Sequence, residues 1–175
     1  MKIIWYPAVS RDGFIATLDG DSDWVIEADE QCFDAEVRQA GCTIVGRTTF
    51  EQYKGSIYPV VGAMTYVVTS HADRLPTEEG VTYVRPNAAE IISKIQDDGF
   101  ATAILSGGGE TNALFAAAGA IDEVIMSIYP ITLGKGIPKL GSFTGELNLE
   151  LLSSQELGQG VVQNRYTVRG KKPIK

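Results

Sequence analysis

The chain has 175 residues, a length typical of one domain with a substantial core. Hydrophobic residues make up 44% of it and charged residues 21%, and its formal net charge is −7. That charge argues against a protein that binds nucleic acids or anionic membranes through a basic surface. No apolar run approaches the roughly 20 residues of a membrane-spanning helix, and the N-terminus lacks the layout of a signal peptide. The sequence predicts a single domain over residues 1–175.

The cysteines and the histidine limit the metal and redox chemistry that the chain can carry. Cys32 and Cys42 form no CxxC pair, and two cysteines are too few for a disulfide scaffold. With His71 as the only histidine, the chain has too few ligands at suitable spacing for a zinc site. We expect free thiols, no bound metal and a reducing, cytoplasmic environment.

The first half of the chain predicts strands that alternate with helices. A strand over residues 2–9 leads into a polar loop over residues 10–23, which carries a short apolar patch at residues 14–16. Ile26, Phe33, Val37 and Ala40 fall on one helical stripe and predict a helix over residues 26–40. A strand over 42–46, a short helix over 48–53 and strands over 63–69 and 81–84 follow, and apolar spacing then predicts a helix from residue 88.

The second half begins with the same alternation and then loses its helices. A strand over residues 101–105 precedes a glycine turn and an alanine-rich helix over residues 112–118. Strands over 123–129, 148–154 and 161–168 follow without intervening helices. This order predicts an α/β fold with a mostly parallel sheet, helices on both faces and antiparallel C-terminal strands.

A run of three glycines, Gly107-Gly108-Gly109, separates a strand from a helix. Glycines remove every Cβ from this turn, so that backbone N–H groups approach a ligand closely at the positive end of a helix dipole. The turn suits the pyrophosphate of a nucleotide. The alternative is a tight turn that binds nothing.

A second strand-to-helix junction carries the residues Gly46-Arg47-Thr48-Thr49. The arginine offers a charged fork suited to phosphate, and the threonines offer hydroxyl groups. The alternative is a threonine that caps the helix beside a surface arginine. Both junctions follow strands, and ligands in such sheets bind beyond the carboxyl ends of the strands.

Five segments in a fixed order are more specific than either junction alone. They read Ser10-Arg11-Asp12-Gly13-Phe14-Ile15-Ala16, Asp23-Trp24, Val45-Gly46-Arg47-Thr48-Thr49-Phe50-Glu51, Ser106-Gly107-Gly108-Gly109-Glu110-Thr111 and Pro130-Ile131-Thr132-Leu133-Gly134-Lys135-Gly136-Ile137-Pro138. Together they resemble the dihydrofolate reductase-like superfamily over about residues 2–168. The chain most resembles the branch of the C-terminal reductase domain of the bacterial bifunctional deaminase-reductase of riboflavin biosynthesis.

This resemblance implies a three-layer α/β/α fold that binds NADPH and forms a homodimer. It implies that Ala8 and Ile15 touch the nicotinamide ring and that Thr69 and Ser70 lie near the adenosine 2′-phosphate. It further implies that two groups of residues hold the cofactor phosphates: Gly46, Arg47, Thr48 and Thr49 at one junction, and Gly107, Gly108, Gly109, Glu110 and Thr111 at the other.

Three polar residues are candidates for catalysis. Asp29 follows Trp24 by five residues, the spacing at which dihydrofolate reductases carry a helix carboxylate, whereas counting back from Gly46 points to Glu30. The alternative for both is a charge that stabilises the N-terminus of the helix. Ser127 matches a central-strand position that carries a hydroxyl near the pterin in dihydrofolate reductase, or it is a strand serine that faces a helix.

The resemblance implies an NADPH-dependent reductase of a small heteroaromatic substrate of the pterin, folate or pyrimidine type. The alternatives are the 5-amino-6-(5-phosphoribosylamino)uracil reductase of riboflavin biosynthesis and an NADPH-binding protein without turnover. The helix after Trp24 departs from the relatives because it is unusually acidic, with Glu27, Asp29, Glu30, Asp34 and Glu36. An anionic substrate is an awkward neighbour for it.

Overall fold

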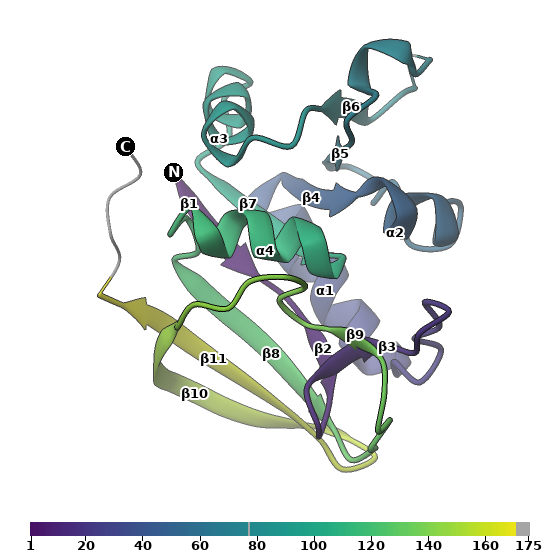
Figure 1. Ribbon diagram of the computed structural model, residues 1–175, viewed down its shortest axis with the longest axis vertical. Coiled ribbons are helices and arrows are strands. Elements are labelled where there is room, and N and C mark those ends of the chain that lie inside the picture. Colours follow the sequence, from purple (N-terminus) through teal and green to yellow (C-terminus); the bar gives the residue numbers. More distant parts are fainter. Residues whose placement is uncertain (77, 171–175) are drawn as a thin grey trace.

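The computed structural model describes residues 1–76 and 78–170, which leaves residue 77 and the basic tail at 171–175 of the expected domain outside the described part. Its helices are α1 (Glu27–Ala40), α2 (Arg47–Gln52), η1 (Ala72–Arg74), α3 (Ala88–Asp97) and α4 (Gly109–Ala117) (Figure 1). Its strands are β1 (Lys2–Trp5), β2 (Ala8–Ser10), β3 (Phe14–Ala16), β4 (Cys42–Gly46), β5 (Met64–Val68), β6 (Val81–Val84), β7 (Thr102–Gly107), β8 (Glu123–Tyr129), β9 (Ile137–Pro138), β10 (Asn148–Gly158) and β11 (Val161–Arg169).

Nine of the described strands form one sheet, in the order β10, β11, β8, β1, β7, β4, β5 and β6, with β2 added beside β8. The pairs from β8 through β1, β7, β4 and β5 to β6 are parallel. The pairs of β11 with β8 and with β10 are antiparallel. This topology confirms the predicted parallel sheet with antiparallel C-terminal strands.

Helices cover both faces of the sheet, because neighbouring strand residues point in opposite directions. Ile4 packs in a cluster with the apolar residues of α1 and α2, whereas Ile3 packs in a second cluster with those of α3 and α4. Figure 1 shows α4 in front of the sheet and α1, drawn fainter, behind it. The three-layer architecture expected from the sequence is therefore confirmed.

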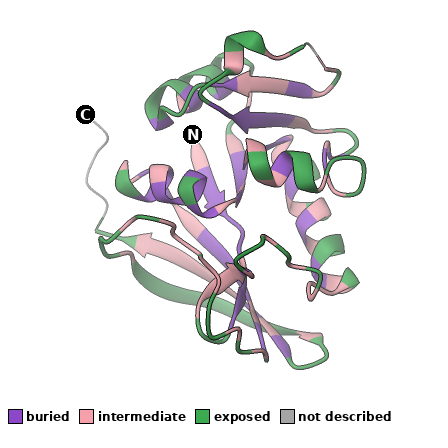
Figure 2. Ribbon diagram, turned by 45° about the vertical axis from the view of Figure 1, so that its right-hand side comes forward, coloured by how far each residue is buried: buried purple, intermediate pink, exposed green. Residues whose placement is uncertain are grey.

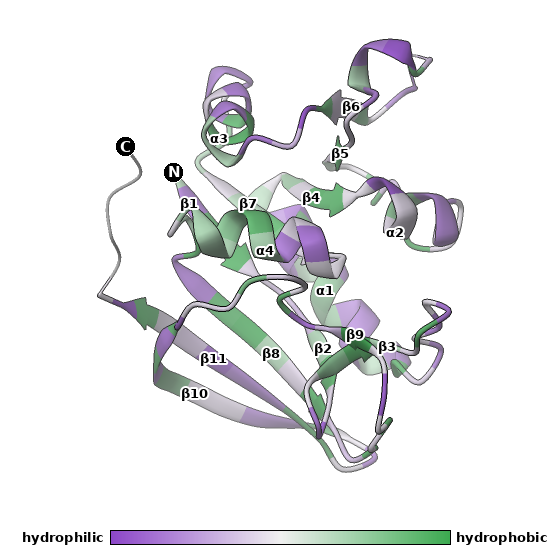
Figure 3. Cartoon of the chain, in the orientation of Figure 1, coloured by the Kyte–Doolittle hydropathy of each residue, from purple (hydrophilic) through white to green (hydrophobic). Residues whose placement is uncertain are grey.

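Helix α4 packs against the sheet along most of its length. Phe115 and Ala116 belong to the cluster on that face. In Figure 3 the first turn of α4 is hydrophilic and the turns that follow are hydrophobic. None of the helices in the described part is long and apolar enough to cross a membrane.

Several predicted boundaries were wrong. The strand expected over residues 2–9 breaks at Tyr6 and Pro7, since proline has no N–H for the ladder. Residues 14–16, expected as part of a loop, form β3, which pairs with β9 in a separate two-stranded sheet. Helix α4 begins at Gly109 rather than at residue 112, and β10 continues to Gly158.

Strand β10 lies at the edge of the sheet and is exposed along almost all of its length (the lowest strand in Figure 2). Leu151 and Leu152 remain 56% and 53% exposed there. Exposed edge strands that carry large apolar residues are unusual in soluble proteins, because their free N–H and C=O groups pair with other chains.

Candidate functional site

A cleft of about 1510 Å³ follows the carboxyl ends of the parallel strands. Twelve of the thirteen residues predicted to bind the cofactor line it, namely Ala8, Ile15, Gly46, Arg47, Thr48, Thr49, Thr69, Ser70, Gly108, Gly109, Glu110 and Thr111. Gly107, the thirteenth, does not line the cleft and is buried behind it. The fold thus brings segments that lie up to about a hundred residues apart into one site.

The two glycine junctions touch each other. Strand β4 lies beside β7, so the turns that follow these strands meet at the same edge of the sheet. A Cβ atom on Gly46 would lie 2.6 Å from the Thr111 Oγ1, and one on Gly108 would lie 2.9 Å from the Thr49 Oγ1. Real Cβ atoms essentially never show contacts this short, so the two turns can approach this closely only with glycine at both positions for as long as Thr111 and Thr49 keep their places.

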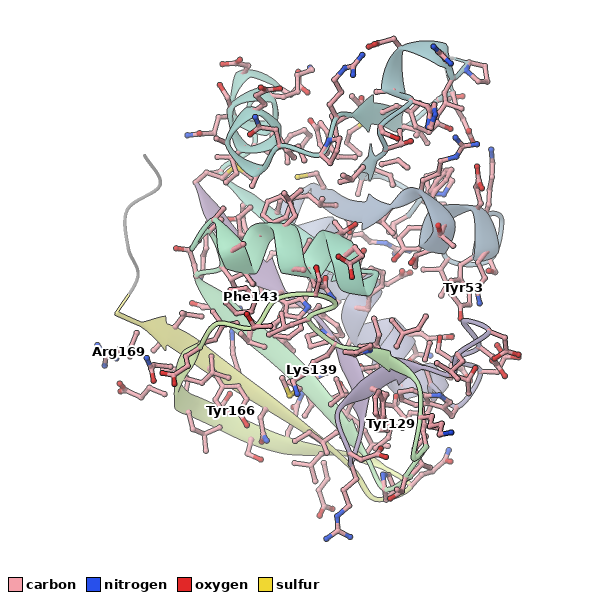
Figure 4. All side chains as sticks on the ribbon, viewed as in Figure 1. Tyr53, Tyr129, Lys139, Phe143, Tyr166 and Arg169 are labelled. Atoms are coloured by element: carbon pink, nitrogen blue, oxygen red, sulfur yellow. The ribbon has the colours of Figure 1, made fainter. Side chains whose placement is uncertain are left out.

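The first turn of α4 opens onto this contact. Its first amide groups have no acceptor within the helix, and they carry the positive end of the helix dipole. Gly107 has a φ of 122°, a conformation in which residues with side chains are strained, and it positions the turn. Asn112 donates from its Nδ2 to the Lys139 backbone oxygen at 2.8 Å and ties α4 to the segment that Figure 4 labels at Lys139.

Arg47 is the only lysine or arginine among the described residues that line the cleft. It is half-buried, and its Nε lies 2.6 Å from the Glu51 Oε1. Thr69 and Ser70 follow the end of β5, where the His71 backbone N–H donates to the Thr69 Oγ1 at 3.2 Å. Positive charge and hydroxyl groups therefore gather at this end of the cleft.

Residues 130–138 fold over the glycine turn. A Cβ atom on Gly109 would lie 2.8 Å from the Pro138 carbonyl oxygen. The Asp12 carboxylate accepts from the Leu133 and Gly134 backbone N–H groups at 3.2 and 2.7 Å and joins this segment to the loop at residues 10–23. The hydrogen bond from Ser10, followed by these backbone bonds, lowers the pKa of Asp12.

The other end of the cleft contains a buried carboxylate. Asp29 is 1% exposed and accepts hydrogen bonds from the hydroxyl groups of Tyr6, Ser127 and Tyr129 at 2.9, 2.8 and 2.7 Å. The Gln163 Nε2 lies 3.3 Å from the same carboxylate and also donates to Tyr6 and Ser127. Buried charges are tolerated only with partners of this kind.

The tyrosines around Asp29 remain protonated. Burial raises the pKa of Tyr6 and of Tyr129, and the charge and hydrogen bond of Asp29 raise both further. Each hydroxyl therefore stays a donor to the carboxylate over the pH range in which proteins fold. Tyr129, labelled at the end of β8 in Figure 4, also accepts from the Ile26 backbone N–H at 3.2 Å and so positions the start of α1.

The structure brings two of the three predicted catalytic residues, Asp29 and Ser127, into hydrogen-bond contact and places the third, Glu30, outside this contact. Asp29 lines the cleft, and Ser127 lies directly behind it without lining the cleft itself. Glu30 is exposed at the rim, one position along α1, and is not part of the hydrogen-bond network. Trp24 packs edge-on against Tyr129, with ring centroids 4.8 Å apart, and does not line the cleft, so it anchors the loop.

Sequence reasoning missed Tyr6, Tyr129 and Gln163. Tyr6 directly follows the apolar strand β1 and Tyr129 ends the apolar strand β8, each beside a proline. Such a polar aromatic residue at the carboxyl end of a strand is a usable signal. Gln163 alternates with Val161 on the buried face of β11. A glutamine at a core-facing strand position indicates a buried polar partner.

The comparisons with known proteins agree with this geometry. The model of the family described as RibD C-terminal domain matches residues 1–163. The "Uncharacterized protein YwjB" of Bacillus subtilis (strain 168) is 31% identical over 165 residues, which cover 91% of this chain and 94% of that protein.

Two solved structures share the fold. The crystal structure of a putative riboflavin biosynthesis protein from Shewanella sp. PV-4 has a TM-score of 0.81 at 24% identity and covers 97% of this chain and 100% of that chain. Dihydrofolate reductase from Enterococcus faecalis, complexed with NADP(H) and RAB-propyl, has a TM-score of 0.75 at 18% identity and covers 97% of both chains. With the family match and the relative at 31% identity, these findings show that the chain belongs to the RibD C-terminal domain family, as the order of the five segments predicted.

Proposed function

We propose that this protein is an NADPH-dependent reductase of a small heteroaromatic substrate. The observation that carries the proposal is the contact between the turns at Gly46 and Gly108. Because both residues are glycines, the cleft next to Arg47 is lined there by backbone and not by side chains. A dinucleotide phosphate fits such a cradle, since backbone N–H groups and one arginine supply its donors. The complex of the Enterococcus dihydrofolate reductase with NADP(H) supports the same cofactor.

Different residues of the cleft serve cofactor binding and the chemical step. When bound, the reduced nicotinamide supplies a hydride. Ala8 and Ile15 both line the cleft and are suited to contact an apolar ring face. Asp29 holds or relays a proton for the substrate, and Tyr6, Ser127, Tyr129 and Gln163 orient its carboxylate.

Calorimetry with NADPH and NADH, followed by the absorbance of the reduced nicotinamide with pterin, folate and pyrimidine substrates, tests the proposal. We expect tighter binding of NADPH. We also expect Arg47→Gln to weaken NADPH more than NADH, because Arg47 and Thr69 follow the paired residues Gly46 and Val68 and so lie together at the proposed site of the 2′-phosphate, which NADH lacks. Arg11→Gln is a matched control, because Arg11 is exposed and does not line the cleft. An absence of binding to both cofactors would overturn the assignment, and binding without oxidation of any substrate would favour a protein that binds NADPH without turnover.

A second candidate is the 5-amino-6-(5-phosphoribosylamino)uracil reductase of riboflavin biosynthesis. The family match and the Shewanella riboflavin biosynthesis neighbour favour it. Its substrate is a phosphate ester, whereas the pterin and pyrimidine bases in the same assay carry no phosphate. Turnover of the ribosylated phosphate alone would assign this activity.

We further propose that the protein forms a homodimer through the edge strand β10. The exposed Leu149, Leu151 and Leu152 of β10 and its unpaired edge support this assignment. Pairing with a second copy would cover the leucines and satisfy the backbone groups of the edge.

A further inference from the structure

The end of the cleft opposite Arg47 carries negative charge. Helix α1 contributes Glu27, Glu30 and Asp34 to its lining, and Asp29 lies buried beneath them. Asp34 pairs with Arg38 at 3.1 Å, but no lysine or arginine of the described residues lies within ion-pair distance of Glu27 or Glu30. Glu27 accepts only from the neutral Gln31 amide, at 3.0 Å.

An aromatic wall lines the same end. Tyr6, Phe33 and Tyr58 all line the cleft, with the ring of Phe33 placed edge-on against Tyr6 at 5.5 Å and against Tyr58 at 6.4 Å between centroids. The Tyr6 hydroxyl donates to Asp29, and the Tyr58 hydroxyl donates to the Ser106 Oγ at 2.9 Å. Both hydroxyl groups are engaged inside the protein, and Tyr6, Phe33 and Tyr58 are only 6%, 9% and 4% exposed. The wall therefore presents a small area of aromatic carbon to the cleft and no free hydroxyl group, which suits a flat ring better than a charged anionic group.

From this pairing of an aromatic wall with an unneutralised acidic rim, we propose that the substrate is a flat heterocycle that is neutral or cationic and carries no phosphate or carboxylate. The inference rests on the proposed reductase function and narrows its substrate class. A phosphate or carboxylate at this end would meet three carboxylates of α1, whose only charged partner among the described residues is Arg38. The one arginine in the described lining of the cleft, Arg47, lies on α2 and is paired with Glu51. This distribution of charge argues against both folate and a ribosyl phosphate ester as substrates.

Two matched pairs of probes test the proposal on the protein saturated with NADPH. They are 6-hydroxymethylpterin with pterin-6-carboxylate, and uridine with uridine 5′-monophosphate. We expect the uncharged member of each pair to bind at least about tenfold more tightly at low salt, because like charges repel and salt screens the repulsion. The Glu27→Gln/Glu30→Gln variant should reduce this preference several-fold. The variant Glu79→Gln/Glu146→Gln removes two exposed acidic residues outside the cleft and should leave the preference unchanged.

A second measurement needs no substrate and no cofactor. Cationic and anionic nitroxides of equal size relax the NMR signals of nearby amide groups in proportion to their local concentration. We expect the excess of the cationic over the anionic probe to be larger at the amides of Gln31 and Ser56 than at those of Thr48 and Ser70, where Arg47 offsets part of the negative charge.

The two tests separate the failure of this proposal from the failure of the reductase function. Equal or tighter binding of an anionic probe, or an anionic nitroxide that accumulates at Gln31 and Ser56, would overturn the substrate class. A preference that survives in Glu27→Gln/Glu30→Gln would overturn the role of the rim. Failure of the reductase function would appear instead as an absence of NADPH binding by calorimetry, or as NADPH binding without oxidation of any substrate, whatever the nitroxide pattern.

Discussion

The Ser127 hydroxyl donates to the Asp29 carboxylate at 2.8 Å, although 98 positions separate the two residues in the chain. Strand β8 lies inside the sheet, and α1 covers the face of the sheet to which Ser127 points. The packing of α1 on this face therefore brings Asp29 next to Ser127. The hydrogen bond fixes the carboxylate where the cleft ends. It includes Asp29, and not Glu30, in the buried hydrogen-bond network, and so supports Asp29 as the carboxylate of the proposed proton chemistry.

Replacement of Asp29 by asparagine should separate chemistry from cofactor binding. We expect Asp29→Asn to lower turnover by about 100-fold, a typical effect of losing a general acid or base, and to leave NADPH affinity near that of the wild type. Glu30→Gln should lower turnover much less, because Glu30 lies outside the hydrogen-bond network. Steady-state oxidation of NADPH and calorimetry measure the two quantities. Unchanged turnover in Asp29→Asn would remove this residue from the mechanism.

The Tyr129 hydroxyl should contribute to stability as well as to the site. It donates to the Asp29 Oδ2 at 2.7 Å and accepts from the Ile26 N–H, so Tyr129→Phe leaves one buried and one partly buried polar group without this partner. We expect the free energy of unfolding to fall by about 1–3 kcal/mol, measured by urea denaturation. Tyr166→Phe is the matched control, because the hydroxyl of Tyr166 is only partly buried and contacts Asn164. An equal loss in both variants would contradict the special role of Tyr129.

The contact between the two glycine turns predicts a steric mutant and its rescue. Gly46 has a φ of −74°, which alanine adopts freely, so Gly46→Ala introduces only the clash with the Thr111 Oγ1. We expect NADPH affinity to fall more than about tenfold, since a displacement of about 1 Å is costly at a binding site. Thr111→Ala removes the clashing oxygen, and the double variant should regain part of the affinity. If the double variant is as weak as Gly46→Ala, the loss has another cause.

The two thiols should react at different rates with an alkylating reagent. Burial and then the Asp98 charge raise the pKa of Cys42 to about 12, and burial with the charges of Asp29 and Glu36 raises the pKa of Cys32. Because the thiolate is the reactive form, a higher pKa leaves less of it at a given pH. At about pH 8, iodoacetamide should label the half-buried Cys32 slowly and Cys42 only after unfolding, as followed by mass spectrometry.

The same shift makes a prediction for stability at alkaline pH. The folded protein binds the Cys42 proton more tightly than the unfolded chain, whose thiol has the ordinary pKa of 9.0. This contribution to stability is full below pH 9.0 and declines as the pH rises toward the folded value. A Cys42→Ala variant should lose stability relative to the wild type at neutral pH and show a smaller difference at high pH. In the iodoacetamide experiment described above, equal labelling of Cys32 and Cys42 in the native protein would refute the buried state of Cys42.

The proposed dimer depends on the edge strand β10. Leu151→Lys places a charge on an exposed edge residue, and we expect it to shift the protein from dimer to monomer in size-exclusion chromatography with light scattering. Val61→Lys is the control, because Val61 is 82% exposed and lies far from β10 in the sheet order, next to β5. A wild-type protein that is monomeric at high micromolar concentration would rule out the dimer.

The order of elements was readable from the sequence, because strands and helices of this protein have different periods. Strands β4, β6 and β8 have the predicted bounds, and Gly41 ends α1 in the left-handed conformation that a terminal glycine indicates. The pairing of β3 with β9 was missed because it depends on a contact between distant segments. The break at Pro7 was missed although its cause, the absent N–H of proline, is local and visible in the sequence.

The candidate site was predictable to the extent that its residues follow strands. The two junctions and Asp29 were found from motif spacing, and the cleft collects them. The choice between Asp29 and Glu30 could not be made from spacing, since both lie near the stripe of α1 that faces the sheet. Only the sheet shows which of them meets the hydroxyl groups of Ser127 and Tyr129.

Because Gly46 packs directly against Thr111, substitutions at these two positions, 65 positions apart in the chain, are expected to depend on each other during evolution. A residue larger than glycine at position 46 fits only where the residue at position 111 is smaller than threonine. Members of the family that carry alanine or serine at the position of Gly46 should therefore carry a smaller residue opposite it. Substitutions at the two positions are expected to occur together, so that neither turn diversifies alone.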